Sequence, residues 1–142
     1  MSERKKRVLA VDDDPLMRGL ILQLLSPAYE VVQAADGVDA LREIQRQPPD
    51  LLLLDLRMPV MDGWQLVDRL ERGRYEVPIV IVSGEAQRPW PDSHLVRARY
   101  KKGALISDLL ALCDSVLAAA PPGGGRKKRA KAGERRPRAP RR

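Results

Sequence analysis

Six residues in the middle of the chain, DLLLLD (50–55), restrict the possible folds more than any other feature. The four leucines leave no polar position for a solvated face, as in a strand that is covered on both sides within a parallel sheet. A carboxylate at the end of so apolar a run is costly to bury unless a partner meets it. We therefore expect Asp55 to lie at the mouth of a site.

Strand-like and helix-like segments alternate along the chain. Apolar runs predict further strands, and apolar residues at helical spacing predict helices. Asp14 can cap the first of these helices, with Pro15 at the first helical position. The predicted strands are 7–11, 29–35, 50–55, 77–83 and a weaker 94–102, and the predicted helices are 15–25, 36–47, 62–72 and 105–120. This alternation predicts an α/β fold, a doubly wound parallel sheet with right-handed crossovers.

The C-terminal region differs from the rest in composition. Residues 126–142 carry ten basic residues and one acid, a net charge of +9, whereas residues 1–125 carry a net charge of −2. Residues 121–142 also lack any apolar side chain larger than proline, so they cannot bury enough surface to offset chain ordering. We expect a folded domain over 1–120 and a disordered basic tail over 121–142.

Composition also limits the cellular setting. Cys113 is the only cysteine, which excludes an intrachain disulfide. The N-terminal residues SERKKR lead directly into a strand-like run and do not resemble a signal peptide. No apolar stretch approaches the length of a membrane span, so a cytoplasmic protein without membrane contact is expected.

Complementary chemistry follows the carboxyl ends of the predicted strands, where such folds bind ligands. Acids follow two strands, a hydroxyl ends another, and two lysines end the last: Asp12, Asp13, Asp55, Ser83, Lys101 and Lys102. Three converging carboxylates repel each other unless a cation is present, and Mg²⁺ prefers oxygen ligands. A carboxylate can then attack a phosphoryl group whose charge the lysine and hydroxyl stabilise.

The pieces VLAVDDDP, PDLLLLDLRMPVMDGWQL and VPIVIVSG, with the KG…LISDLL region, are similar to the receiver domain of bacterial two-component response regulators. The pattern D-x-x-M-P-x-M-D-G, with a preceding D-D, is the most specific of these signals. The resemblance implies a flavodoxin-like (βα)5 fold with strand order 2-1-3-4-5. It also implies a signalling domain that is phosphorylated by a histidine kinase or phosphotransfer protein, and not an enzyme beyond catalysing its own phosphorylation and dephosphorylation.

The resemblance assigns roles to individual residues. Asp55 would be the phosphoacceptor, and Asp12, Asp13, Asp55 and the backbone carbonyl of Arg57 would hold Mg²⁺. Ser83 would take the switch hydroxyl position. Lys102, preferred over Lys101 because of where the leucines of the last helix then fall, would bind the phosphate.

The chain departs from the family pattern near that lysine. Gly103 stands where the family usually has proline, so we expect a trans Lys102–Gly103 bond. Arg99 stands where the family usually has an aromatic switch residue, so we expect phosphorylation without the usual aromatic switch and a response concentrated in residues 83–102. The short segment before it, with RPWPD, predicts a short or broken fourth helix, and its Trp90 is either a loop anchor or a partner contact.

Three other functions are alternatives to the receiver hypothesis. A phosphatase of the haloacid dehalogenase type would need an acid two residues after Asp55, where this chain has Arg57. The domain could instead be a scaffold derived from a receiver, with atypical switching. The basic tail could bind nucleic acid or another polyanion through charge alone, although the chain has no recognisable reader motif. The leading hypothesis is a single-domain receiver with output through protein contacts to an unknown target.

Overall fold

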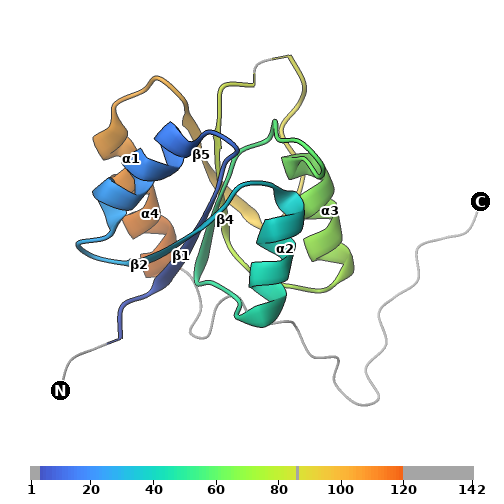
Figure 1. The fold of residues 1–142 in the computed structure, drawn as a ribbon, viewed down its shortest axis with the longest axis horizontal. Coiled ribbons are helices and arrows are strands. Elements are labelled where there is room, and N and C mark those ends of the chain that lie inside the picture. The colour runs from blue at the N-terminus through green and yellow to red at the C-terminus, as the bar shows by residue number, and fades with distance from the viewer. Residues whose placement is uncertain (1–3, 86, 120–142) are drawn as a thin grey trace, which may run out of the picture.

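The computed structural model describes residues 4–85 and 87–119, and a five-stranded parallel sheet forms its centre (Figure 1). The strands are ordered β2-β1-β3-β4-β5, as predicted. Their bounds are β1 Arg7–Val11, β2 Glu30–Ala34, β3 Leu51–Leu54, β4 Ile79–Ser83 and β5 Val96–Lys101. The helices are α1 Pro15–Leu25, α2 Gly37–Arg46, α3 Gly63–Arg72 and α4 Ile106–Ala119.

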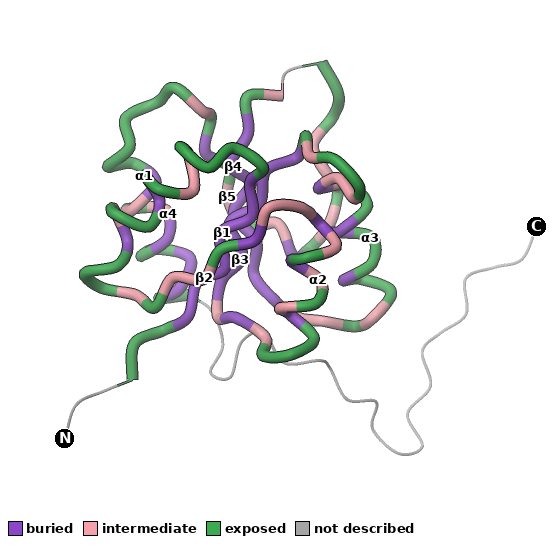
Figure 2. Tube along the Cα trace, in the orientation of Figure 1, coloured by how far each residue is buried: buried purple, intermediate pink, exposed green. Residues whose placement is uncertain are grey.

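Two hydrophobic layers enclose the sheet. Helices α1 and α4 cover one face, and α2 and α3 cover the other (Figure 1). All residues of β1, β3 and β4 are buried, as Figure 2 shows for the centre of the molecule. The leucines of β3 divide between the layers, because successive side chains of a strand point to opposite faces. This division explains why β3 has no polar position.

Aspartates begin three of the helices, as the sequence predicts for the first. The Asp14 side chain accepts a hydrogen bond from the N–H of Leu16 at 2.9 Å, with Pro15 at the first helical position. Asp36 caps α2. Asp62 and Gln65 form a reciprocal capping box at the start of α3. These caps fix the chain as it leaves the carboxyl edge of the sheet.

The connection from β4 to β5 differs from the prediction. A short or broken helix was expected there, but no helix forms in residues 84–85 or 87–95, the part of the connection that the structure describes. Pro89 and Pro91 provide the reason, since each lacks an N–H and disfavours helical geometry in the residue before it. β5 therefore follows β4 through an extended loop.

Within residues 4–85 and 87–119, no helix is long and apolar enough to cross a membrane. The tail predicted to be disordered, residues 121–142, lies outside the described residues. The end of the expected domain at residue 120 also stays a prediction, although α4 reaches Ala119.

Candidate functional site

Three carboxylates meet at the carboxyl edge of the sheet. Asp12 and Asp13 follow β1, and Asp55 follows β3, which pairs with β1 so that Val11 lies opposite Leu54. One carboxylate oxygen from each acid lies within 4.8 Å of the others. The adjacent strands thus bring together the acids that the sequence placed at one edge.

Asp12 is buried, and both of its carboxylate oxygens have a partner. Its Oδ1 accepts a hydrogen bond from the N–H of Asp14 at 2.9 Å. Its Oδ2 lies 2.8 Å from the Lys102 ammonium, within hydrogen-bond distance of that charged donor. An exposed carboxylate, Asp13, lies beside it. Oxygen donors of this kind fit a hard divalent cation that retains several waters.

Lys102 follows β5, the outermost strand of the sheet, and its side chain reaches the acidic cluster. Its Nζ lies 2.8 Å from Asp12 Oδ2 and 3.3 Å from Asp55 Oδ2. Its backbone N–H donates to the carbonyl oxygen of Ser83, which holds the end of β5 beside the end of β4. Lys101 is exposed and has no ion pair with a described residue. Of the two candidate lysines, the structure therefore brings Lys102 to the acids.

Burial and charge shift the titration of this cluster. Burial raises the pKa of Asp55 to about 6; the charge of Asp12 adds to the rise and Lys102 opposes it. Burial would lower the pKa of Lys102, but Asp12 and Asp55 outweigh that effect, so its pKa is above the ordinary value. The ammonium is therefore charged at neutral pH. The positive charge of Lys102 offsets only part of the effect of burial and of Asp12 on the Asp55 carboxylate.

The backbone also holds the Asp55 side chain. The N–H of Leu56 donates to Asp55 Oδ1 at 2.8 Å, and the N–H of Asp55 itself donates to the carbonyl oxygen of Val11 at 2.9 Å. The side chain is only 6% exposed. A carboxylate fixed in this way can present an oxygen to a ligand that enters along the sheet edge.

Ser83 ends β4 and is buried. Its Oγ accepts a hydrogen bond from the N–H of Glu85 at 3.0 Å. The hydroxyl thereby fixes the first turn of the β4–β5 loop. Since β3 and β4 are adjacent, Ser83 lies on the same sheet edge as Asp55.

Arg57 connects the loops that follow β3 and β4. Its side chain forms an ion pair with the largely buried carboxylate of Glu85, which joins the β3–α3 and β4–β5 loops. Its guanidinium also lies 5.4 Å from the centre of the Trp64 ring, and that of Arg88 lies 3.9 Å from the same ring. Trp64 Nε1 donates to the carbonyl oxygen of Pro89 at 2.8 Å. These contacts attach the helix-free loop to α3.

A tight turn shapes the loop after Asp55. Val60 has φ +69°, a strained value for a β-branched residue, and the N–H of Met61 donates to the carbonyl oxygen of Pro59 at 2.8 Å. The Met61 carbonyl oxygen then accepts the N–H of Gly37 at 3.0 Å. A Cβ on Gly37 would lie only 2.5 Å from that oxygen. The turn thus connects the loop to the start of α2.

Sequence reasoning missed two of these residues. Glu85 was not singled out, although it stands two positions after the predicted hydroxyl, where a polar side chain can face the site. Gly37 was read only as part of a helix start; its close approach to Met61 is set by a long-range contact. Arg57 was predicted for its backbone carbonyl, and the contacts of its side chain were not anticipated.

The departures near Lys102 are explained by backbone geometry. The described residues contain no cis peptide bond, so the Lys102–Gly103 bond is trans, as expected. Gly103 has φ +99°, which proline cannot adopt and other L residues rarely do. Tyr100 is buried, and Arg99, at the aromatic position, is exposed.

The parallel sheet in this order defines a flavodoxin-like α/β fold with an acidic cluster at its carboxyl edge. The sequence model of the response regulator receiver domain matches residues 8–98 of the chain. The chain therefore belongs to the response regulator receiver domain family.

Curated relatives share this domain within longer proteins. The chain is 39% identical over 90 residues to the transcriptional regulatory protein GlrR of Escherichia coli K12, covering 63% of this chain and 20% of that protein. It is 50% identical over 82 residues to protein-glutamate methylesterase/protein-glutamine glutaminase 1 of Dechloromonas aromatica, covering 56% and 23%. The chain thus spans less than a quarter of these relatives, whose own activities differ.

Solved structures agree with the fold. The receiver domain of a sensor histidine kinase from Pseudomonas aeruginosa, with magnesium coordinated in its active-site cleft, is 27% identical with a TM-score of 0.71, covering 81% of this chain and 99% of that one. The response regulator TrrA of Thermotoga maritima, in complex with Mg²⁺-BeF, is 25% identical with a TM-score of 0.70, covering 78% and 98%.

Proposed function

We propose that the chain accepts a phosphoryl group on Asp55 within a two-component phosphorelay. The observation that carries this proposal is the position of Asp55 beyond β3, in one acidic cluster with Asp12 and Asp13 and 3.3 Å from the Lys102 ammonium. A nucleophilic carboxylate, a cation and neighbouring oxygen donors are the groups that phosphoryl transfer needs.

Mg²⁺ is part of the proposal. Asp12, Asp13, Asp55 and the backbone carbonyl of Arg57 would hold it, and the convergence of one carboxylate oxygen from each of the three acids within 4.8 Å supports this assignment. The bound metal would neutralise charge on the carboxylates and on the incoming phosphoryl group. Magnesium in the cleft of the related Pseudomonas domain supports the same assignment.

The protein's own groups would act as follows. A carboxylate oxygen of Asp55 attacks phosphorus, a P–O bond forms, and the bond from phosphorus to the donor nitrogen breaks with its electron pair going to the donor. Lys102 stabilises negative charge on the transferred oxygens, and the Ser83 hydroxyl donates to one of them. The chain would thus catalyse its own phosphorylation and dephosphorylation and no other reaction.

The proposed donor is a histidine kinase or phosphotransfer protein. Similarity to the sensor histidine kinase TmoS, 44% identical over 81 residues, supports a donor of this kind. Output through protein contact and a cytoplasmic location belong to the same proposal. Because the relatives have different outputs, the target of this chain is not transferred from any of them.

Acetyl phosphate provides the test. With Mg²⁺, the full chain should gain the mass of one phosphoryl group, and Asp55→Asn should not. Asp68→Asn is the matched control, because Asp68 is exposed on α3 and pairs with Arg72 at the surface. Persistent labelling of Asp55→Asn, or equal loss in both variants, would contradict the assignment.

The basic tail favours a second, separate activity. Its net charge of +9 over residues 126–142 suits salt-dependent attraction to nucleic acid or another polyanion. Comparing the full chain with a version that ends at residue 122, on a random single-stranded DNA and at increasing salt, tests this idea. Equal binding by both versions would contradict it.

A further inference from the structure

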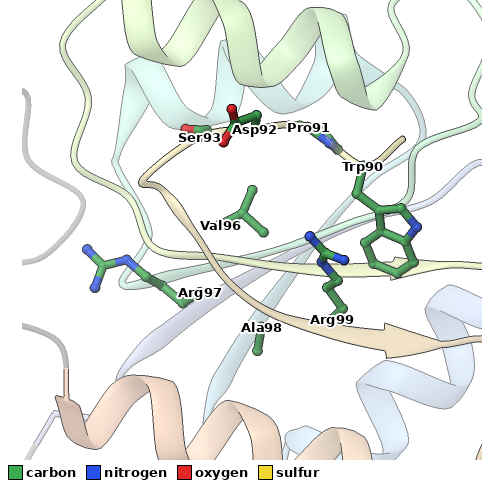
Figure 3. A pocket seen from close by; sticks show the side chains of 8 residues that line it. All are labelled: Trp90, Pro91, Asp92, Ser93, Val96, Arg97, Ala98 and Arg99. Carbon is green, nitrogen blue, oxygen red and sulfur yellow. The ribbon is translucent and has the colours of Figure 1, made fainter. Parts of the chain in front are cut away.

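The helix-free loop between β4 and β5 leaves a cavity of about 570 Å³ beside β5 (Figure 3). We call this the β5 groove, and its lining includes Trp90, Asp92, Ser93, Val96, Arg97 and Arg99. Figure 3 shows Val96 and the Arg99 guanidinium directed toward the loop, with Trp90 beside Arg99. The floor is therefore apolar and the strand side is cationic.

One wall of the groove is the open edge of the sheet. β5 is the last strand in the order and pairs only with β4 among the described strands. The N–H of Lys102 donates toward β4, so the alternating pattern of a parallel strand directs the backbone groups of Arg99 and Lys101 outward. Those groups can pair with an added extended segment.

The exposed side chains along this edge are all basic. Arg97, Arg99 and Lys101 alternate with the more buried Ala98 and Tyr100. Arg99 lies 5.0 Å from the centre of the Trp90 ring, which holds its guanidinium over the groove. Arg97 makes no ion pair with any residue in the described part of the chain, and Figure 3 shows it extending away from the loop. Both guanidinium groups therefore remain available to carboxylates.

Charge repulsion argues against two possible occupants of the β5 groove, a second copy of the chain and the chain's own tail. A second copy that paired β5 with β5 across a two-fold axis would place Arg97, Arg99 and Lys101 opposite the same residues, and like charges directly opposite are destabilising. The chain's own tail is strongly basic and would be repelled in the same way. The edge charges thus prevent self-pairing and select an acidic partner.

An acidic polypeptide suits the groove better than a nucleic acid. An extended peptide can use both the outward backbone groups and the apolar floor formed by Trp90 and Val96. A nucleic acid has no peptide N–H and C=O groups that could extend the sheet along the edge of β5.

We propose that the β5 groove binds an acidic, extended segment of a partner protein, which adds to the edge of β5 and places carboxylates on Arg97 and Arg99. This binding goes beyond phosphoryl transfer and requires no phosphoryl group on Asp55. The helix-free β4–β5 loop makes it possible, because a helix there would cover the same face of β5.

A synthetic peptide tests the proposal directly. A labelled eight-residue peptide that alternates glutamate with valine should bind the unphosphorylated full chain, measured by fluorescence anisotropy. The same peptide with glutamine for glutamate should bind at least about tenfold more weakly, since charge-assisted hydrogen bonds are roughly twice as strong as neutral ones. Amide chemical shift changes should concentrate in residues 90–101.

Matched variants separate the groove from the basic tail. Arg97→Gln/Arg99→Gln should weaken binding at least about tenfold, whereas Arg42→Gln/Arg72→Gln, which removes the same charge from exposed sites on α2 and α3, should leave it within about twofold. Arg97→Gln alone should also weaken binding. A loss in this variant does not come from a loosened loop, because the arginine that stacks on Trp90 is Arg99 and not Arg97. Equal loss in both double variants, unchanged binding in Arg97→Gln/Arg99→Gln, or tighter groove binding by a random single-stranded DNA would overturn the proposal.

Discussion

Lys102 Nζ lies 2.8 Å from the buried Asp12 Oδ2 and 3.3 Å from Asp55 Oδ2. One ammonium thus offsets two buried carboxylates. Burying an uncompensated charge is costly, so the acidic edge depends on this lysine whenever no metal is bound.

Replacement of Lys102 measures that dependence. In a chelating buffer, Lys102→Met should lower the free energy of unfolding by roughly 1–3 kcal/mol, because it leaves both carboxylates without a cation. Mg²⁺ should restore part of the loss. Lys101→Met is the control, and as an exposed change it should stay within about 0.5 kcal/mol. Urea unfolding of both variants provides the measurement, and equal losses would exclude the special role of Lys102.

The pKa of Asp55 predicts how stability depends on pH without metal. Since its pKa is raised from 3.8 to about 6, the folded protein binds more protons than the unfolded chain between these values. The contribution of Asp55 is therefore most favourable below about pH 4, falls as the pH rises, and is fully lost above about pH 6.

Asp55→Asn should remove that part of the pH dependence. The variant should exceed wild type in free energy of unfolding by up to about 3 kcal/mol at pH 7, the limit set by the shift in pKa, with little difference near pH 4. Urea unfolding between pH 4 and 8 in a chelating buffer tests this. Parallel curves for the two proteins would show that Asp55 titrates normally.

Gly103 should tolerate neither alanine nor proline. Its φ of +99° is strained for alanine, which should cost roughly 1–2 kcal/mol, and proline should cost more because its φ is fixed near −65°. Gly103→Pro should also slow phosphorylation of Asp55, since it moves the neighbouring Lys102. Gly19→Ala is the control: it lies in α1 with open space around its Cβ and should stabilise by roughly 0.5–1 kcal/mol. A stable, fully active Gly103→Pro would contradict this account.

The regular part of the fold was predictable because it depends on local patterns. The all-apolar β3 could only be a covered strand, and Asp14 followed by Pro15 predicted the start of α1. The acids at the ends of β1 and β3 were predictable as neighbours once the sheet was parallel. The choice between Lys101 and Lys102 rested on the resemblance, and the geometry supports it because the side chain of Lys102 reaches both acids.

The contacts between loops could not be predicted from the sequence. Arg57 and Glu85 are 28 positions apart in loops without periodicity, so no pattern in the sequence pairs them. The missing helix between β4 and β5 was only partly anticipated from its prolines, because the stacking of Trp64 and Trp90 on arginines also holds the loop. Such pairs depend on the path of the loops, which is set by tertiary contacts.

The final prediction concerns the response to phosphorylation. Ser83 Oγ now accepts the N–H of Glu85, and Glu85 in turn pairs with Arg57. If the hydroxyl turns toward a phosphoryl group on Asp55, the first turn of the β4–β5 loop changes its hydrogen bonding. Arg99 is exposed and stacked on Trp90, and burying its charge would be costly, so no side chain at that position can move inward as an aromatic ring would.

We therefore expect beryllofluoride with Mg²⁺ to change amide exchange mainly in peptides that cover residues 83–102, with little change in α4. The fluorescence of Trp90 should shift at the same time, because its indole lies in this loop. The variant Trp90→Phe separates the fluorescence change of Trp90 from that of Trp64, the other tryptophan of the chain. Asp55→Asn should abolish both responses. A large change in exchange across α4, with residues 83–102 unaffected, would show that the signal leaves the site by another route.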